Sequence, residues 1–157
     1  MIEELRARIR AQYKPDFEFT TVGRVPFTTA SKPVVSSRIA LISTAGLHLD
    51  DQEPFDRTTP TGDCSYRRVR TDDDLFRLRI HWDVDHQQPA SQDLNCAFPL
   101  ALLRELEQNR EIGSVASMHY SFSGAIPDPR AILDHSAPAV AHELRADAVD
   151  AVLVAPS

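Results

Sequence analysis

The chain has 157 residues, of which 42% are hydrophobic and 25% charged, and its formal net charge at pH 7 is -6. This length suits one domain with a substantial core, and the composition is that of a soluble globular protein. The acidic balance argues against a nucleic-acid partner, because such binding depends on Lys and Arg contacts to phosphates. No stretch approaches about 20 apolar residues, so the sequence predicts a cytoplasmic protein without a membrane span.

A helix is predicted over residues 1–14, followed by an extended segment over residues 15–36 that wraps the domain. The helix ends before Pro15 and carries one apolar stripe. The stripe has two interpretations, since it fits a helix lying on its own domain and also a contact in a homo-oligomer. Its residues recur at spacings of three and four, at Ile2, Leu5, Ile9 and Tyr13.

Four strands are predicted in the rest of the chain. Residues 37–46 and 149–155 contain unbroken apolar runs, as expected of strands buried on both faces of a parallel sheet. Residues 114–124 form a β-branched and aromatic run expected at the centre of the sheet. Residues 75–85 alternate apolar and polar side chains, which predicts a half-buried strand. Residues 50–74 are predicted to be a long surface excursion.

Helices are predicted over residues 98–110 and from Asp128 onward. Pro138 predicts either a kink or two helices in series within the second of these. The order of elements predicts a single α/β domain over residues 1–157, Rossmann-like or flavodoxin-like, whose mostly parallel sheet and flanking helices occupy residues 37–157. The inward residues of the second helical segment are predicted to be Ile132, Leu133, Val140, Ala141 and Leu144.

The small residues that end the first apolar strand are candidates for substrate binding. Ser43, Thr44 and Gly46 would let a ligand approach the carboxyl end of a strand, where open α/β sheets place their sites. A plain tight turn is the alternative interpretation. His48 follows this turn and is a further candidate.

His119 is the strongest candidate for a catalytic side chain in the central strand. It is either a core histidine with satisfied hydrogen bonds or a site residue near the carboxyl end of that strand. Tyr120 and Gly124 accompany it as candidate substrate-binding residues.

His81 and Asp83 share the polar face of the alternating strand. Together with His119 or His86 they could provide two histidines and a carboxylate for a divalent metal, the only cofactor that the residues themselves suggest. They could also form a His-Asp acid/base pair, or belong to a solvated strand face. Cys64 and Cys96 are far apart and lack a CxxC partner, so both are expected to be free thiols.

Six motifs in succession resemble the selenoprotein B subunits of glycine, sarcosine, betaine and D-proline reductases. The resemblance runs from about residue 20 to the last residue. It implies an oxidoreductase of amino acid metabolism that reductively cleaves a C–N bond, with a selenocysteine or cysteine nucleophile and a partner subunit carrying a pyruvoyl group. The motifs are LISTAGLHL, PTGDCSYR, DLNCAFPLALLREL, EIGSVASMHYSFSGAIPDP, APAVAHEL and VDAVLVAPS.

The resemblance does not place the nucleophile in this sequence. In the family the strand matching VDAVLVAPS is followed by the segment that bears the redox-active residue, and neither Cys64 nor Cys96 falls at that position. The expectation is therefore a reductase-like subunit for a small amino-acid-type substrate, with the thiol on a partner and pocket walls at 43–46 and 119–124. A non-catalytic accessory subunit, or a metal-dependent enzyme using His81, Asp83 and His119, are the alternatives.

Overall fold

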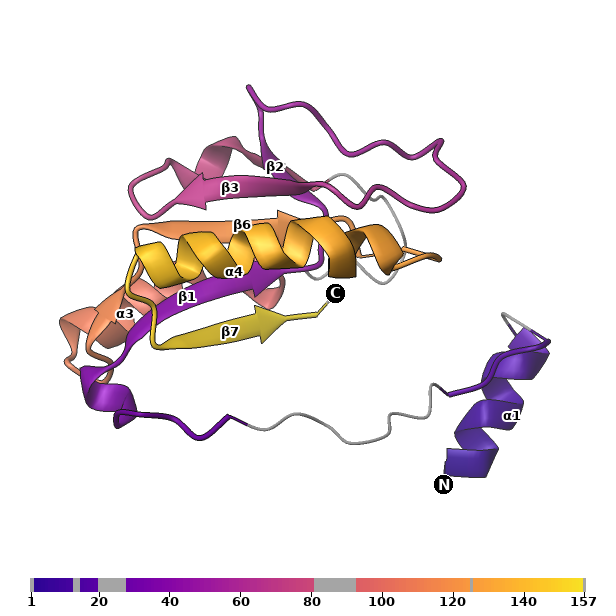
Figure 1. Ribbon diagram of the computed structural model, residues 1–157, viewed down its shortest axis with the longest axis horizontal. Helices are drawn as coiled ribbons and strands as arrows, with labels where there is room; N and C mark the ends of the chain where they lie inside the picture. Colours follow the sequence, from indigo (N-terminus) through magenta and orange to yellow (C-terminus); the bar gives the residue numbers. More distant parts are fainter. Residues whose placement is uncertain (1, 13–14, 20–27, 81–92, 125, 157) are drawn as a thin grey trace.

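The computed structural model describes residues 2–12, 15–19, 28–80, 93–124 and 126–156. Within them a mixed, mostly parallel sheet has α3 packed on one face and α4 on the other, which confirms the predicted α/β class (Figure 1). The elements in chain order are α1 (Ile2–Gln12), η1 (Val34–Ser36), β1 (Arg38–Ser43), β2 (Leu47–Leu49), β3 (Tyr66–Arg70), η2 (Leu75–Arg77), β4 (Leu78–Ile80), η4 (Leu94–Cys96), α3 (Leu100–Gln108), β5 (Ser114–Val115), β6 (Met118–Phe122), η5 (Ile132–Ser136), α4 (Ala137–Ala146) and β7 (Ala151–Ala155).

β1 forms the centre of the sheet. β7 pairs with it in parallel on one side, and β5 and β6 pair with it in parallel on the other. The chain thus leaves β1 for β6 and then crosses back to β7, and the helices that precede these two strands lie on opposite faces (Figure 1). The carboxyl ends of β1 and β7 therefore flank a topological switch point, where open α/β sheets bind their ligands.

The predicted central strand at 114–124 is interrupted. Val115 pairs with Ile39 and Tyr120 pairs with Ile42, so five residue steps on β5 and β6 face only three on β1. The two extra residues form a bulge, which locally breaks the backbone ladder. At the bulge the Leu41 amide of β1 donates to the side chain of His119 on β6 instead of to a backbone carbonyl.

Two predictions about burial along the sheet are wrong. The expected surface excursion at 50–74 contains β3, an antiparallel edge strand on β6 whose Val69 is fully buried. One apolar residue among arginines gives no alternating pattern, so the sequence did not reveal this strand. β7 is parallel as predicted but exposed, because it lies at an edge that no described element covers.

The helical prediction from Asp128 is confirmed in part. The chain makes a π-helical turn, η5, that runs directly into α4 near Pro138. The predicted inward position of Leu133 is wrong, since its side chain is 66% exposed. A π-helical turn holds more residues than an α-helical turn and so rotates the buried face away from this position.

Short elements complete the described chain. β2 and β4 form a separate antiparallel pair, and β4 confirms part of the alternating strand predicted at 75–85, whose residues from 81 onward lie outside the described chain. α1 lies within the predicted N-terminal helix, and none of its described residues is buried. None of the helices in the described residues is long and apolar enough to cross a membrane.

Candidate functional site

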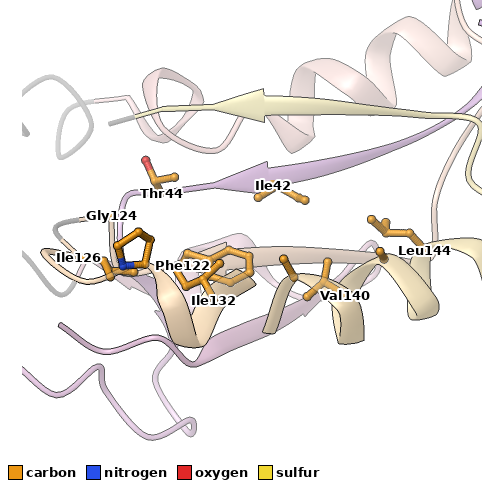
Figure 2. Close-up of a pocket in the computed structure, with 11 residues that line it drawn as sticks. Ile42, Thr44, Phe122, Gly124, Ile126, Ile132, Val140 and Leu144 are labelled. Atoms are coloured by element: carbon orange, nitrogen blue, oxygen red, sulfur yellow. The ribbon is translucent and has the colours of Figure 1, made fainter. Parts of the chain in front are cut away.

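A cavity of about 430 Å³ lies between the sheet and α4, at the carboxyl ends of β1 and β6 (Figure 2). This α4 cavity is open at one side and mostly apolar. Thr44 contributes the one polar side chain among its described lining residues. The lining comprises Ile42, Thr44, Phe122, Gly124, Ile126, Pro129, Ile132, Ala137, Val140, Ala141 and Leu144.

The turn after β1 joins the ends of three strands. The Thr44 amide donates to the Ala155 carbonyl of β7 (3.2 Å), and the Gly46 amide donates to the Phe122 carbonyl of β6 (2.9 Å). Gly46 has a φ of 64°, which glycine adopts at low cost. The turn is therefore fixed at the mouth of the α4 cavity, with these two amides already occupied by protein carbonyls.

Ser43 lies beneath this turn rather than in the cavity. Its side chain is fully buried, and its Oγ accepts a hydrogen bond from the Ala45 amide (3.2 Å). The Oγ of Ser121 accepts another from the Leu47 amide (2.8 Å). Among the predicted substrate-binding residues of this turn, only Thr44 lines the α4 cavity.

Gly124 is the second predicted residue that lines the cavity. It has a φ of 82°, and a Cβ built on it would lie 2.2 Å from the Thr44 carbonyl oxygen. No side chain fits at that distance, so the loop after β6 approaches the turn after β1 only because glycine stands here.

His119 lies inside the protein, away from the α4 cavity. Its side chain is fully buried on the opposite face of the sheet, edge-on to Phe98. Its Nδ1 accepts from the Leu41 amide (3.0 Å), so its Nε2 carries the proton and donates to Thr71 Oγ1 (3.0 Å). The Thr71 hydroxyl in turn donates to the Ala116 carbonyl.

The environment of His119 favours its neutral form. Burial lowers its pKa to about 4, and the positive charge of Arg104 adds to the decrease. A neutral imidazole with both nitrogens bonded ties β1, the bulge and the end of β3 together. We propose that His119 positions these strands and does not contact substrate.

Tyr120 belongs to a hydrogen-bonded group that holds α4 on the sheet. Its hydroxyl donates to Glu143 Oε2 (3.1 Å), and the hydroxyl of Tyr66 donates to Glu143 Oε1 (2.9 Å). The Arg68 Nε also donates to Glu143 Oε2 (2.8 Å). These donors, with Arg68 the strongest, lower the pKa of Glu143 to about 2. The group thus supports the helical wall of the α4 cavity from behind.

Replacing Glu143 with glutamine should lower the free energy of unfolding by about 1 to 2 kcal/mol at pH 7, because the amide nitrogen that replaces one oxygen then faces the donors that this oxygen accepted. The pKa of Glu143 is depressed on folding, so its stabilising effect is present above its unfolded pKa and is lost as pH falls toward about 2. Urea unfolding at pH 7 and pH 3 measures both effects. Glu105→Gln, on the exposed face of α3, is the matched control. An equal and small loss in the two variants would contradict the prediction.

Another predicted residue, His48, is not among the described residues that line the α4 cavity. His48 lies on β2, 8% exposed, with Nδ1 2.9 Å from the Leu49 carbonyl oxygen. His81 and Asp83 lie outside the described residues, so the metal and acid/base hypotheses that need them stay predictions. Within the described part of the chain, no three His, Cys, Asp or Glu side chains are grouped to hold a metal.

Neither cysteine lines the α4 cavity. Cys64 is half-buried, and its Sγ lies 3.7 Å from the Asp128 carbonyl oxygen. Cys96 is exposed at the end of η4. Both are free thiols, as predicted.

The cavity also contains residues that the sequence did not single out as functional. Ile42 belongs to the unbroken apolar run of β1, and Ala141 to the apolar side of α4, where each looked like an ordinary core residue. Their periodicity does not show that these side chains line a cavity, because this depends on how α4 packs across β6.

The glycine/sarcosine/betaine reductase selenoprotein B family matches residues 2–157. The chain belongs to this family. This confirms the resemblance seen in its motifs. It is also similar to the D-proline reductase subunit gamma of Acetoanaerobium sticklandii, with 26% identity over 128 residues that cover 82% of this chain and 52% of the relative. The chain therefore spans about half the length of that relative. No solved structure matches it.

Proposed function

We propose that the chain is a scaffold subunit of a reductase that cleaves a C–N bond in a small amino-acid-type substrate. The observation that carries this proposal is the α4 cavity at the carboxyl ends of β1 and β6. The chain's membership of the family, over residues 2–157, supports it. The relative's name describes it as one subunit of a reductase, which supports action together with another polypeptide.

The nucleophile is proposed to reside on that other polypeptide, because neither Cys64 nor Cys96 lines the α4 cavity. A selenol or thiol there, together with a second thiol, would supply the two electrons and two protons that convert the C–N bond into C–H and N–H bonds. The two sulfur or selenium atoms would end joined to each other. This chain would bind the carbon skeleton and keep water from it.

The chemistry of the cavity narrows the proposed substrate. Its apolar walls suit ring carbons or N-methyl groups better than the bare ammonium of glycine. No charged side chain is found among its described lining residues, so the substrate carboxylate would extend past Thr44 and out of the cavity, beyond the carboxyl end of β1. Cyclic and N-methylated amino acids are therefore favoured.

Methyl NMR tests the substrate-binding part of this proposal. Adding D-proline, sarcosine or betaine should shift the methyl signals of Ile42, Ile132 and Leu144, with at least tenfold weaker binding of glycine, because a small apolar group fills the cavity. Ala141→Phe should abolish the shifts, since the ring would occupy the cavity. Ala139→Phe, on the exposed side of the same helix, should leave them intact. If none of the four compounds moves these signals, substrate does not bind here.

A further inference from the structure

A second cavity, of about 550 Å³, lies at the opposite end of β6 from the α4 cavity. It is found where β3 ends and β6 begins, since Arg70 on β3 pairs with Met118 on β6 (Figure 1). Its size is within the range of small-molecule sites, about 300 to 1,000 Å³. Its described lining residues, all polar or charged, are Arg70, Thr71, Asp72, Asp73, Arg104 and Ser117. Ser117 belongs to the bulge between β5 and β6, so we call this space the bulge cavity.

Arg104 supplies the bulge cavity with hydrogen-bond donors that the protein does not use. It lies half-buried on α3, next to the buried Leu103. Within the described part of the chain, no acceptor bonds its guanidinium and no carboxylate pairs with it. Its charge is nevertheless close enough to the buried His119 to lower the pKa of that imidazole. A cation that has lost part of its hydration gains from a charged acceptor, and a carboxylate suits a guanidinium best.

The two hydroxyls of the bulge cavity face a ligand as acceptors only. Ser117 Oγ donates to Asp147 Oδ2 (2.8 Å), and Thr71 Oγ1 donates to the Ala116 carbonyl. A hydroxyl has one proton and two lone pairs, so both protons are used inside the protein. Thr71 Oγ1 also accepts from His119 Nε2 (3.0 Å), which leaves it one lone pair. These oxygens can therefore accept from a ligand N–H but cannot donate to an anion.

Two carboxylates extend this acceptor side. Asp72 pairs with the Arg70 guanidinium (2.9 Å) on the exposed rim, and Asp73 accepts from the Arg70 amide (2.7 Å). A carboxylate has about four lone-pair sites, so each can accept further bonds. The two arginines and two aspartates of the cavity cancel in charge, so a simple anion has no net charge to attract it. A ligand that carries both signs matches the donors of Arg104 and the acceptors opposite.

We infer that the bulge cavity binds a free amino acid whose ammonium group carries N–H bonds. The ligand carboxylate would accept from Arg104, and its N–H groups would donate to Ser117, Thr71 and the two aspartates. The inference goes beyond the proposed function and does not depend on it. The bulge cavity lies at the amino end of β6, whereas sheets of this class bind their substrates at the carboxyl ends of strands. The ligand would therefore act as an effector that joins α3 to the end of β3.

Glycine is the probe, because three compounds each lack one of its features. Acetate lacks the ammonium group, methylammonium lacks the carboxylate, and betaine lacks N–H bonds. Titration with millimolar glycine should shift the amide NMR signals of Thr71 and Ser117 and raise the Tm. Each of the other three compounds should bind about tenfold more weakly or worse, because one side of the cavity then loses its charged partner.

Three variants test the two sides of the bulge cavity. Arg104→Met should weaken glycine binding about tenfold and leave the Tm of the free protein unchanged, because its guanidinium has no partner among the described residues. Arg145→Met, at an exposed arginine in the last turn of α4, should bind glycine as the unaltered protein does. Asp72→Asn should weaken glycine binding and strengthen acetate binding, because the cavity then has a net positive charge.

Three results would overturn the inference. The first is that glycine leaves the amide signals of Thr71 and Ser117 unmoved. The second is that acetate binds as tightly as glycine, which would make the cavity a site for simple anions. The third is an unchanged glycine affinity in Arg104→Met. These amide signals report the bulge cavity whether or not the methyl signals of the α4 cavity respond, so this inference and the proposed function can fail separately.

Discussion

Replacing His119 with alanine is expected to lower the free energy of unfolding by about 3 to 5 kcal/mol at pH 7, since it removes a buried ring and leaves the Leu41 amide without its acceptor. His119→Asn keeps an oxygen near the position of Nδ1 and should recover part of this loss. Equilibrium unfolding in urea measures both. His142→Ala, at an exposed position on α4, should change the stability by less than about 0.5 kcal/mol.

The pH dependence identifies the protonation state of His119. Its pKa falls from 6.5 to about 4 on folding, so the folded protein binds fewer protons than the unfolded chain between these values. The stabilising effect is complete above pH 6.5 and is lost as pH falls toward 4, by about 3 kcal/mol in all. The stability difference between the unaltered protein and His119→Asn should therefore narrow over this range.

A catalytic His119 would give a different result. It would tolerate alanine with little change in stability, and its ring would report substrate addition by NMR. A stability difference that stays constant from pH 6.5 to 4 would show that the imidazole is not held neutral by the fold.

The sequence predicted those elements whose apolar residues follow a clear period or run. β1 and β7 appeared as unbroken apolar segments, and α3 as a regular apolar stripe. β3 could not be found in this way, because its one buried side chain, Val69, stands between arginines and its partner strand is distant in sequence. Pairing across the sheet decided its structure, not local propensity.

Some residues of the candidate site could likewise be predicted from the sequence, and others could not. Thr44 and Gly124 were predicted because small residues at strand ends have a local meaning, and both line the α4 cavity. His119 had two interpretations in the sequence. Only the bulge between β5 and β6 shows that its ring replaces a missing backbone partner. The role of Glu143 likewise depends on three donors from two strands that the chain brings together by folding.

Gly124→Ala is expected to destabilise the protein by at least about 3 kcal/mol, through the cost of a left-handed residue with a Cβ and the displacement of a tightly packed carbonyl. The added methyl would lie 2.2 Å from the Thr44 oxygen, which is backbone and cannot rotate away. The two turns must separate, and the bond from the Gly46 amide to the Phe122 carbonyl should break. Faster hydrogen exchange at Gly46, measured with urea unfolding, reports this separation.

Gly62→Ala separates the two causes. Gly62 has a similar φ of 85° but lies in the loop before β3, so its variant carries the conformational cost without the contact to Thr44. It should lose about 1 to 2 kcal/mol and leave exchange at Gly46 unchanged. If the Gly124 variant loses no more than this, the close approach of the two turns does not hold the mouth of the α4 cavity. If it loses more and Gly46 exchanges faster, the glycine fixes the geometry of the site.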